Sequence, residues 1–423
     1  MNRSEGDRVR TGVFMLIVMA SCTLAALADG FRNPPEGGAA LGRAGTRLTQ
    51  GDDPSAISHN PANILDLTGV SVMPSVTIGY GKKEYTAVDG ISDKTSQPWH
   101  YMPSVYGVWS RGDVAVGLGV STPFGQANEW EENGILQPYY SSVRSVNANP
   151  TVALKLGKHL MAGAGVDILW SEVELRQSLA NPAMPGDFNR MTLKGDGYGF
   201  GANVGLTWLI TDKQRMSVVY RAPISVDCDG DFSLEKPLPL PPPLASMLSS
   251  SGDFESKLEF PTVVAAGYGI RVLDALRIEA DVEWIEHSRY DEAKVDLGQN
   301  NPLIHIDQLI APAPMVNFDP LTVRQDWQDT WTFSLGADWD MTPNWTLRGG
   351  FTWLPTPVPD ETINSSTAES DQSLCAIGLG FHTGSQRLDV AYAPAFARDR
   401  KDAAGGTYEF TSHLMAASYS VMF

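Results

Sequence analysis

The chain has 423 residues and a formal net charge of −18, and charged residues make up 19% of it. Such an acidic balance argues against a nucleic-acid partner. Beyond the N-terminal region no stretch approaches the roughly 18 to 20 apolar residues of a membrane-spanning helix, so any membrane insertion has to use a closed β-barrel.

Residues 1–28 have the pattern of a secretory signal peptide. Three arginines precede an apolar run over residues 13–26, and Ala26-Leu27-Ala28 supplies small residues for cleavage before Asp29. A retained anchor helix and a lipoprotein-type cleavage at Cys22 are the alternatives. Export would place the mature chain where disulfides can form.

Residues 29–69 do not alternate as a strand does. Small residues and glycine dominate the stretch. About forty residues is longer than an ordinary connection. The segment is therefore predicted to be a periplasmic tail or a plug.

The clearest strand pattern lies between Ala275 and Glu286. One face carries apolar side chains and the other charged ones. The apolar positions are Leu276, Ile278, Ala280, Val282 and Trp284, and the charged positions are Arg277, Glu279, Asp281 and Glu283. Strict period two indicates a strand between a polar and an apolar environment. A soluble sandwich could show it too.

The same pattern recurs along the chain. The predicted strands are residues 70–80, 101–110, 113–121, 144–156, 159–175, 195–210, 214–227, 255–271, 275–287, 326–339, 344–354, 373–383, 386–396 and 409–423. Their number, fourteen, is even, as in bacterial single-chain barrels. The 40 glycines suit turns and bends, and the 11 tryptophans suit interface girdles.

The connections give a second signal, because short and long ones alternate. The short ones are 111–112, 157–158, 211–213, 272–274, 341–343 and 384–385; the long ones are 81–100, 122–143, 176–194, 228–254, 288–325, 355–372 and 397–408. Short periplasmic turns and long outer loops are typical of outer-membrane barrels. The final strand ends at Phe423, the type of end that barrel-assembly machinery reads. We therefore predict an all-β fold, a fourteen-stranded antiparallel transmembrane β-barrel.

Several short motifs add a family resemblance over most of the mature chain. They are Asp29-Gly30-Phe31, Ala40-Leu41-Gly42-Arg43-Ala44, Ser58-His59-Asn60-Pro61-Ala62, Pro123-Phe124-Gly125, Tyr198-Gly199-Phe200-Gly201, Ala202-Asn203-Val204-Gly205, Tyr220-Arg221, Asn344-Trp345-Thr346-Leu347-Arg348-Gly349-Gly350 and Pro357-Val358-Pro359. In order and spacing they resemble the FadL family of outer-membrane long-chain fatty-acid transporters, which includes aromatic-hydrocarbon channels. The resemblance implies that residues 29–69 form a hatch inside a barrel of residues 70–423.

The resemblance also implies a route and a set of site residues. Ligand would pass from a surface groove to a luminal pocket and leave sideways beside a kinked third strand. Gly30 and Phe31 would touch ligand, and Asn60, Pro61 and Ala62 would lie in the part of the hatch that meets the gap. The alternatives are a disordered N-terminus and a plain turn. The family implies a monomer.

Two further groups are candidates for ligand contact. Leu244, Met247 and Leu248 form an apolar stretch in the fourth long connection, where packing on the rim is the alternative. The third connection, around 176–194, is short for the family, which puts the surface groove in question. Three arginines on polar strand faces could hold a fatty-acid headgroup or could pair with Asp281 or Asp338. They are Arg221, Arg277 and Arg348.

Other classes of function fit less well. The seven histidines are scattered, and the sequence contains no Gly-x-Ser-x-Gly, His-Glu-x-x-His or paired-cysteine motif, so we predict neither an enzyme nor a cofactor or metal site. A general diffusion porin would lack a long segment before its first strand. The predicted function is passive uptake of long-chain fatty acids or similar hydrophobic molecules. Which ligand is carried, and whether Cys228 and Cys375 pair, stay open.

Overall fold

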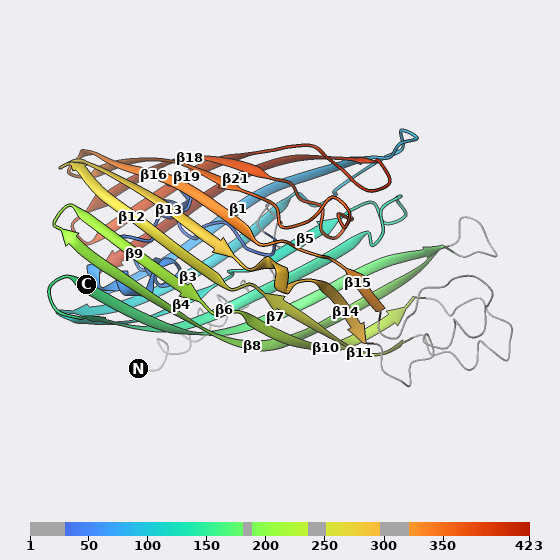
Figure 1. Ribbon diagram of the computed structural model, residues 1–423, viewed down its shortest axis with the longest axis horizontal. Helices are drawn as coiled ribbons and strands as arrows, with labels where there is room; N and C mark the ends of the chain where they lie inside the picture. Colours follow the sequence, from blue (N-terminus) through green and yellow to red (C-terminus); the bar gives the residue numbers. More distant parts are fainter. Residues whose placement is uncertain (1–29, 181–187, 236–250, 297–320) are drawn as a thin grey trace, which may run out of the picture.

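The computed structural model describes residues 30–180, 188–235, 251–296 and 321–423. These residues form one closed barrel of antiparallel strands, and the first strand pairs with the last from Ser71↔Met422 to Thr86↔Thr407. Figure 1 shows the strands running obliquely along the barrel. No helix in these ranges is long and apolar enough to cross a bilayer.

Seven of the fourteen wall strands are interrupted, so each of these is described as two elements. In chain order the elements are β1 (Gly69–Thr86), β2 (Ser92–Lys94), β3 (Trp99–Arg111), β4 (Val114–Ser121), β5 (Gly125–Glu129), β6 (Tyr140–Lys155), β7 (Leu160–Ala180), β8 (Phe188–Thr211), β9 (Gln214–Arg221), β10 (Ile224–Leu234), β11 (Ser251–Phe260), β12 (Val263–Leu273), β13 (Leu276–Ile285), β14 (Glu292–Asp296), β15 (Leu321–Arg324), β16 (Thr330–Thr342), β17 (Trp345–Leu354), β18 (Gln372–Thr383), β19 (Gln386–Ala397), β20 (Arg400–Lys401) and β21 (Thr407–Met422). The predicted fourteen-stranded antiparallel barrel is confirmed.

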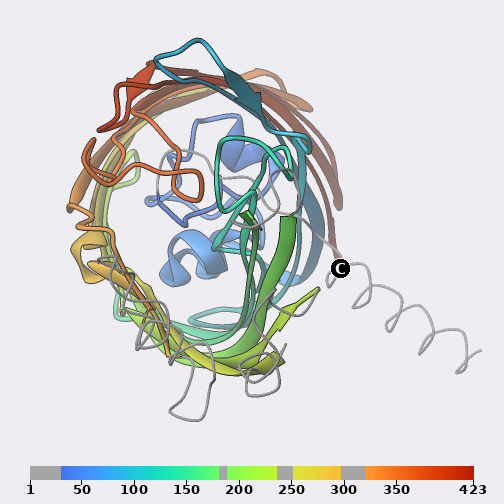
Figure 2. The same cartoon turned by 90° about the vertical axis from the view of Figure 1, so that its right-hand side faces the viewer.

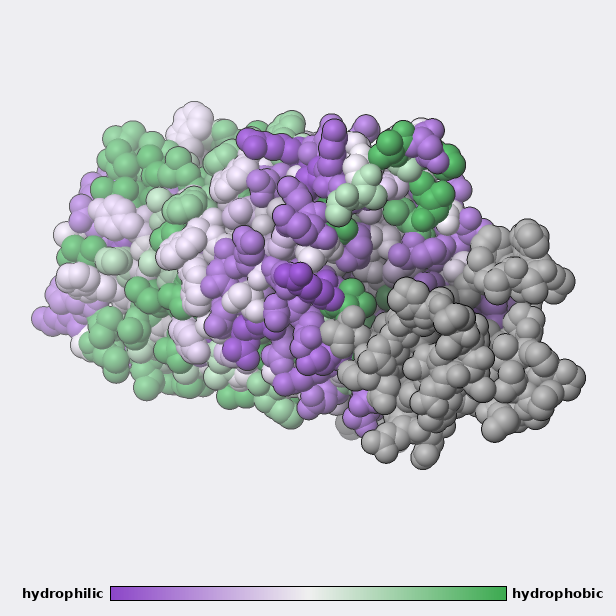
Figure 3. All heavy atoms as spheres, turned by 45° about the vertical axis from the view of Figure 1, so that its right-hand side comes forward, coloured by the Kyte–Doolittle hydropathy of each residue, from purple (hydrophilic) through white to green (hydrophobic). Residues whose placement is uncertain are grey.

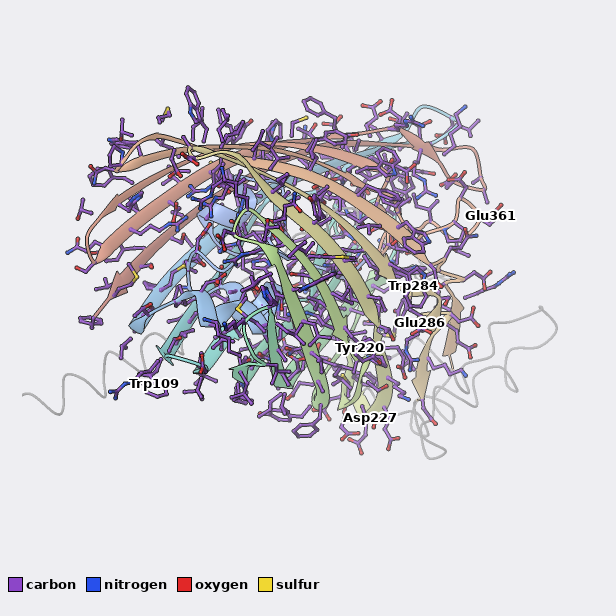
Figure 4. The ribbon with its side chains drawn as sticks, turned by 60° about the vertical axis from the view of Figure 1, so that its left-hand side comes forward. Trp109, Tyr220, Asp227, Trp284, Glu286 and Glu361 are labelled. Atoms are coloured by element: carbon purple, nitrogen blue, oxygen red, sulfur yellow. The ribbon has the colours of Figure 1, made fainter. Side chains whose placement is uncertain are left out.

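The outer face is apolar where lipid would contact it. Exposed tryptophans lie beside the short turns, at Trp109, Trp208, Trp339 and Trp345. Figure 3 shows the hydrophobic surface gathered on one part of the barrel and a hydrophilic band beyond it. Figure 4 places Trp109 at the short-turn end and Glu361 at the opposite end. The hydrophobic surface is thus bordered, at the short-turn end, by the aromatic side chains that are typical of a bilayer interface.

The strands extend further on the loop side than the sequence indicated. β7 continues to Ala180 and β8 begins at Phe188, so the prediction of a loop over 176–194 was wrong. Likewise β14 and β15 occupy parts of the predicted loop 288–325. Backbone pairing between strands continues beyond the hydrophobic part of the outer face. Hydropathy patterns alone therefore do not mark where a strand ends.

The predicted strand 113–121 ends at a break in the wall, and the predicted strands 214–227 and 255–271 each contain one. A kink at residues 122–124 separates β4 from β5, and residues 222–223 and 261–262 divide the other two. β4 pairs with β3 from Val105↔Val120 to Arg111↔Val114, whereas the ladders of β5 run only to β6. The wall is joined again at the Ser96 amide, which donates to the Glu129 carbonyl. Between these points the β3–β5 ladder is interrupted.

A second irregularity brings β10 close to β8. Tyr198 and Phe200 point outward. The glycines that alternate with them, Gly197, Gly199 and Gly201, face inward against β10. A Cβ at Gly199 would lie 2.6 Å from the Ser225 carbonyl oxygen, closer than real Cβ atoms come. Close packing against β10 therefore explains the glycines of the Tyr-Gly-Phe-Gly motif.

We predict that Gly199→Val lowers the yield of folded barrel, because the added side chain has to displace backbone of β10. Overpacking of this kind costs about 1–3 kcal/mol. Gly349→Val is the matched control, since a Cβ there has only the Ala376 carbonyl oxygen nearby, at 3.9 Å. Heat-modifiable migration in electrophoresis measures the folded fraction. Equal folded fractions for the two variants would contradict this account.

Candidate ligand-binding site

Residues 30–68 lie inside the barrel and are called the luminal segment below. Figure 2, a view along the barrel, shows this segment enclosed by the ring of strands. It contains three short helical turns, α2 (Gly38–Leu41), α3 (Ala56–His59) and η1 (Pro61–Asp66). Nearly all of its side chains are buried. The described lumen is therefore occupied by chain rather than open.

Buried ion pairs fasten the luminal segment to the wall. Arg43 Nη1 lies 2.7 Å from Asp338 Oδ2 of β16, and both side chains are at most 1% exposed. Arg348 of β17 lies 2.9 Å from the other oxygen of Asp338 and 2.8 Å from Asp389 of β19. Arg277 of β13 reaches Asp52 at 3.2 Å. Deeply buried charges need partners. The pairs of Arg43 with Asp338 and of Arg277 with Asp52 join the luminal segment to the wall, and Arg348 links two carboxylates of the wall itself.

The charged face of β13 also fastens the luminal segment to the wall. Glu279 accepts a hydrogen bond from the Thr49 amide at 2.7 Å, and Asp281 accepts one from the Arg47 amide at 3.0 Å. The third carboxylate on this face, Glu283, accepts from Arg32 at 2.9 Å. The charged residues that alternate with apolar ones along β13 thus anchor the luminal segment, which is called the plug below. Sequence analysis missed this role, although three carboxylates at every second position were its visible sign.

Asp53 and His59 are among the ionisable groups of the luminal segment whose pKa values are shifted. Burial raises the pKa of the Asp53 carboxyl, but Arg47 and Arg387 outweigh it and hold the pKa below its usual range. Burial, with the nearby Arg47 adding to it, lowers the pKa of His59 to about 3. His59 is therefore uncharged at neutral pH.

Phe31 lies in an aromatic cluster at the loop end of the luminal segment. Its ring centroid is 4.8 Å from those of Tyr290 and Trp327 and 6.1 Å from that of Phe260, and the side chain is 3% exposed. Gly30 has a φ of 60°, and a Cβ there would come within 2.8 Å of Trp327 and His287. Only glycine fits this position without strain.

The backbone beside Phe31 bridges the kink between β4 and β5. The Gly125 amide donates to the Phe31 carbonyl at 2.7 Å, and the Asn33 amide donates to the Pro123 carbonyl at 2.9 Å. Arg32 forms an isolated β-bridge with Phe124. The start of the luminal segment thus supplies backbone partners where the wall ladder is interrupted.

A cavity of about 170 Å³ lies between this bridge and the wall. Its apolar surface comes from residues such as Phe124, Ile224, Val263, Leu354 and Leu374, and its polar surface from Arg32, His59, Asn147, Asn149, Asp167, Arg221, Glu283, Thr332 and Gln372. The cavity combines apolar walls with a few convergent polar groups, as small-molecule sites do. The asparagines and Asp167 were missed by sequence analysis.

Asn60, Pro61 and Ala62 lie elsewhere in the plug. The Asn60 side chain donates to Leu48 O at 2.7 Å and to Thr207 Oγ1 at 2.9 Å, and accepts from the Ala62 amide at 3.0 Å. This trio packs on β7 and β8 at Gly163 and Gly205. Residues 31–33, rather than Asn60–Ala62, contact the kink. The gating role of Asn60–Ala62 stays a prediction.

The other candidate residues divide as follows. Arg277 forms ion pairs with Asp52 and Asp338, and Arg348 forms them with Asp338 and Asp389. Arg221 lines the cavity. Leu244, Met247 and Leu248 lie outside the described residues. Cys228 and Cys375 are both free thiols, the first buried and the second exposed.

Comparison with known proteins matches this architecture to one family. The family model described as "Outer membrane protein transport protein (OMPP1/FadL/TodX)" matches residues 19–423. The chain belongs to this family. It is accordingly an outer-membrane protein of a family whose members transport hydrophobic compounds.

Individual relatives of this FadL-family chain are distant. It is 23% identical to the putative outer membrane protein NMB0088 of Neisseria meningitidis serogroup B, over 91% of this chain and 90% of the relative. It is 22% identical to a long-chain fatty acid transport protein of Escherichia coli O6:H1, over 96% and 94%.

Solved structures show the same fold. A Pseudomonas aeruginosa FadL homologue superposes with a TM-score of 0.79 at 19% identity, covering 93% of this chain and 100% of the homologue. The Ralstonia pickettii toluene transporter TbuX superposes with a TM-score of 0.68 at 17% identity, covering 94% and 99%. At these identities the likeness extends to the fold alone.

We predict that Asp338→Asn loosens the plug and raises the ion conductance of the barrel in planar bilayers. The change removes the carboxylate that Arg43 and Arg348 share, and Arg348 keeps Asp389 whereas Arg43 loses its short ion pair. Breaking a buried ion pair on one side costs about 3–5 kcal/mol. Asp274→Asn is the control, because its pair with Lys213 is exposed and worth about 0–1 kcal/mol. A conductance of Asp338→Asn equal to that of the control would argue against plug anchoring by this network.

Proposed function

We propose that this barrel takes up long-chain fatty acids or similar hydrophobic compounds passively, through the luminal cavity and a lateral opening at the kink between β4 and β5. The observation that carries the proposal is the coincidence of three features at one height in the barrel: the Phe31 aromatic cluster, the cavity and the interrupted ladder. A molecule in the cavity is separated from the wall break only by the bridge of residues 31–33.

A continuous apolar core on the loop side of the cavity supports the same route. Buried side chains of this core come from the luminal segment, from β1, β6, β7, β10, β11 and β21, and from the connections β5–β6, β15–β16 and β17–β18. They include Phe31, Tyr85, Trp130, Tyr140, Leu169, Ile224, Phe260, Trp327, Val358 and Ile363. An acyl chain gains roughly 0.8 kcal/mol for each methylene it buries. A concentration gradient and such burial are sufficient to drive entry without a nucleotide or an ion.

In this proposal Gly30 and Phe31 are ligand contacts, and the bridge at residues 31–33 is the element that moves. Phe31 is covered by aromatic rings, so ligand has to replace some of its ring contacts. Asn60–Ala62 would hold the plug while the bridge shifts, and Leu244, Met247 and Leu248 would meet ligand at the outer surface. Ligand would leave into the outer-membrane lipid. The barrel would act as a monomer, assembled through the signal at Phe423.

An aromatic-hydrocarbon channel of the same fold is the second candidate. The ring-lined environment of Phe31 favours it, and structures titled toluene transporters are among the neighbours of this chain. A general diffusion porin fits less well, because residues 30–68 occupy the lumen. We do not propose an enzyme, since the members of the family are transport channels.

We predict saturable binding of a radiolabelled long-chain fatty acid or of toluene to the purified barrel, weakened about tenfold or more by Phe31→Ala. Loss of a buried aromatic contact at a binding site has an effect of this size. Phe333→Ala is the matched control, because Phe333 is 55% exposed on the outer face. The preferred ligand would distinguish the two candidates. Absence of binding together with open conductance in planar bilayers would indicate a general porin.

A further inference from the structure

The polar wall of the cavity is organised around one carboxylate. Asp167 of β7 accepts hydrogen bonds from three asparagine amides, those of Asn147 at 2.6 Å, Asn149 at 2.7 Å and Asn203 at 3.0 Å. The donors come from β6 and β8, on either side of β7. The acceptor capacity of Asp167 facing these strands is thus filled by the protein.

These contacts fix how the amides are oriented. An ionised carboxylate only accepts hydrogen bonds, so each asparagine has to turn its NH₂ group toward Asp167 and its carbonyl oxygen away. Among the described residues, Asn147 Oδ1 and Asn203 Oδ1 then have no donor. Asn147 is 6% exposed and lines the cavity. A buried acceptor without a donor costs free energy.

The opposite wall carries two more such atoms. Gln372 Oε1 of β18 and Thr332 Oγ1 of β16 are buried, line the same cavity and have no hydrogen-bond partner within the described parts of the chain. At the bridge, Asn33 donates its NH₂ to Thr122 O, which leaves Asn33 Oδ1 facing no donor there. Three unfilled amide oxygens and one unfilled hydroxyl thus belong to residues that line the cavity from three sides.

The charges around the cavity do not favour an anion. Arg32 is paired with Glu283 at 2.9 Å, and Arg221 lies 4.0 Å from Asp167 and donates to Ser58 O. The third carboxylate, Glu36, accepts from Tyr106. His59 is uncharged, so two guanidinium groups face three carboxylates.

We infer that the cavity binds the polar end of an uncharged amphiphile that donates hydrogen bonds, such as a long-chain alcohol or another hydroxylated hydrocarbon. This inference rests on the proposed function and narrows its substrate class. A ligand hydroxyl donates to one unfilled amide oxygen and accepts from the Thr332 hydroxyl, and its chain lies against Phe124, Val263 and Leu374. A fatty-acid anion brings only acceptors, and a plain hydrocarbon leaves the acceptors unfilled.

The test compares three probes of equal chain length, tritiated 1-dodecanol, dodecanoate and dodecane, on the full barrel in an amphipathic polymer at neutral pH. We expect 1-dodecanol to bind saturably and about tenfold or more tightly than either other probe, the discrimination typical of a site built for a hydroxyl. Dodecanoate or dodecane binding as tightly as 1-dodecanol would overturn the inference and leave the proposed function standing. Failure of all three to bind would overturn both.

Variants separate hydrogen bonding from cavity shape. Thr332→Val and Gln372→Met remove an unfilled oxygen at nearly constant volume and leave Asp167 and its amides untouched. Each is expected to weaken 1-dodecanol binding about 3- to 10-fold, the effect of one hydrogen bond, with dodecane binding unchanged. The matched control is Thr330→Val. Thr330 Oγ1, also on β16, is buried and has no hydrogen-bond partner among the residues that the structure describes, but Thr330 does not line the cavity. Equal weakening of both probes by Thr332→Val would contradict the inference.

Discussion

Arg43 and Asp338 meet 2.7 Å apart inside the lumen, and the arrangement of the candidate site depends on this contact and on those joined to it. Neither charge reaches solvent, so each stabilises the structure only while the other is in place. Arg348 and Asp389 extend the network along the wall, and the carboxylates of β13 hold the plug backbone beside it. The plug is therefore held in a single position. The cavity and the Phe31 cluster exist because that position leaves a space beside the kink.

The bilayer explains why so much of the wall could be predicted from the sequence. Lipid on one side and a polar lumen on the other impose period two on every crossing strand. Residues 275–287 show this most clearly, and β13 indeed runs from Leu276 to Ile285. The alternation of short and long connections follows from the direction of assembly in the membrane. These signals are local, so a single sequence carries them.

The candidate site was less predictable because its contacts are not local. Asp167 meets Asn147 and Asn203 through the pairing of three strands, and no spacing in the sequence marks that register. Pro223 and Pro261 are visible in the sequence, but the inward approach of β10 to β8 depends on glycines of another strand. The resemblance to a family implied that Phe31 touches ligand, which stays a prediction. It did not indicate that the cavity would present unfilled acceptors, because those depend on the orientation of individual amides.

The order of the anchors along the chain has a consequence for biogenesis. The luminal segment precedes β1, whereas its charged partners lie in β13, β16 and β19, up to 335 positions later. The luminal segment is synthesised before the whole wall and thus acquires its partners last. Long sequence separation between contacting residues slows folding. Docking of the segment and closure of the ring between β1 and β21 consequently belong to the same late stage of folding, and a chain truncated before β16 would lack Asp338 and Arg387, two of the wall partners that hold its luminal segment.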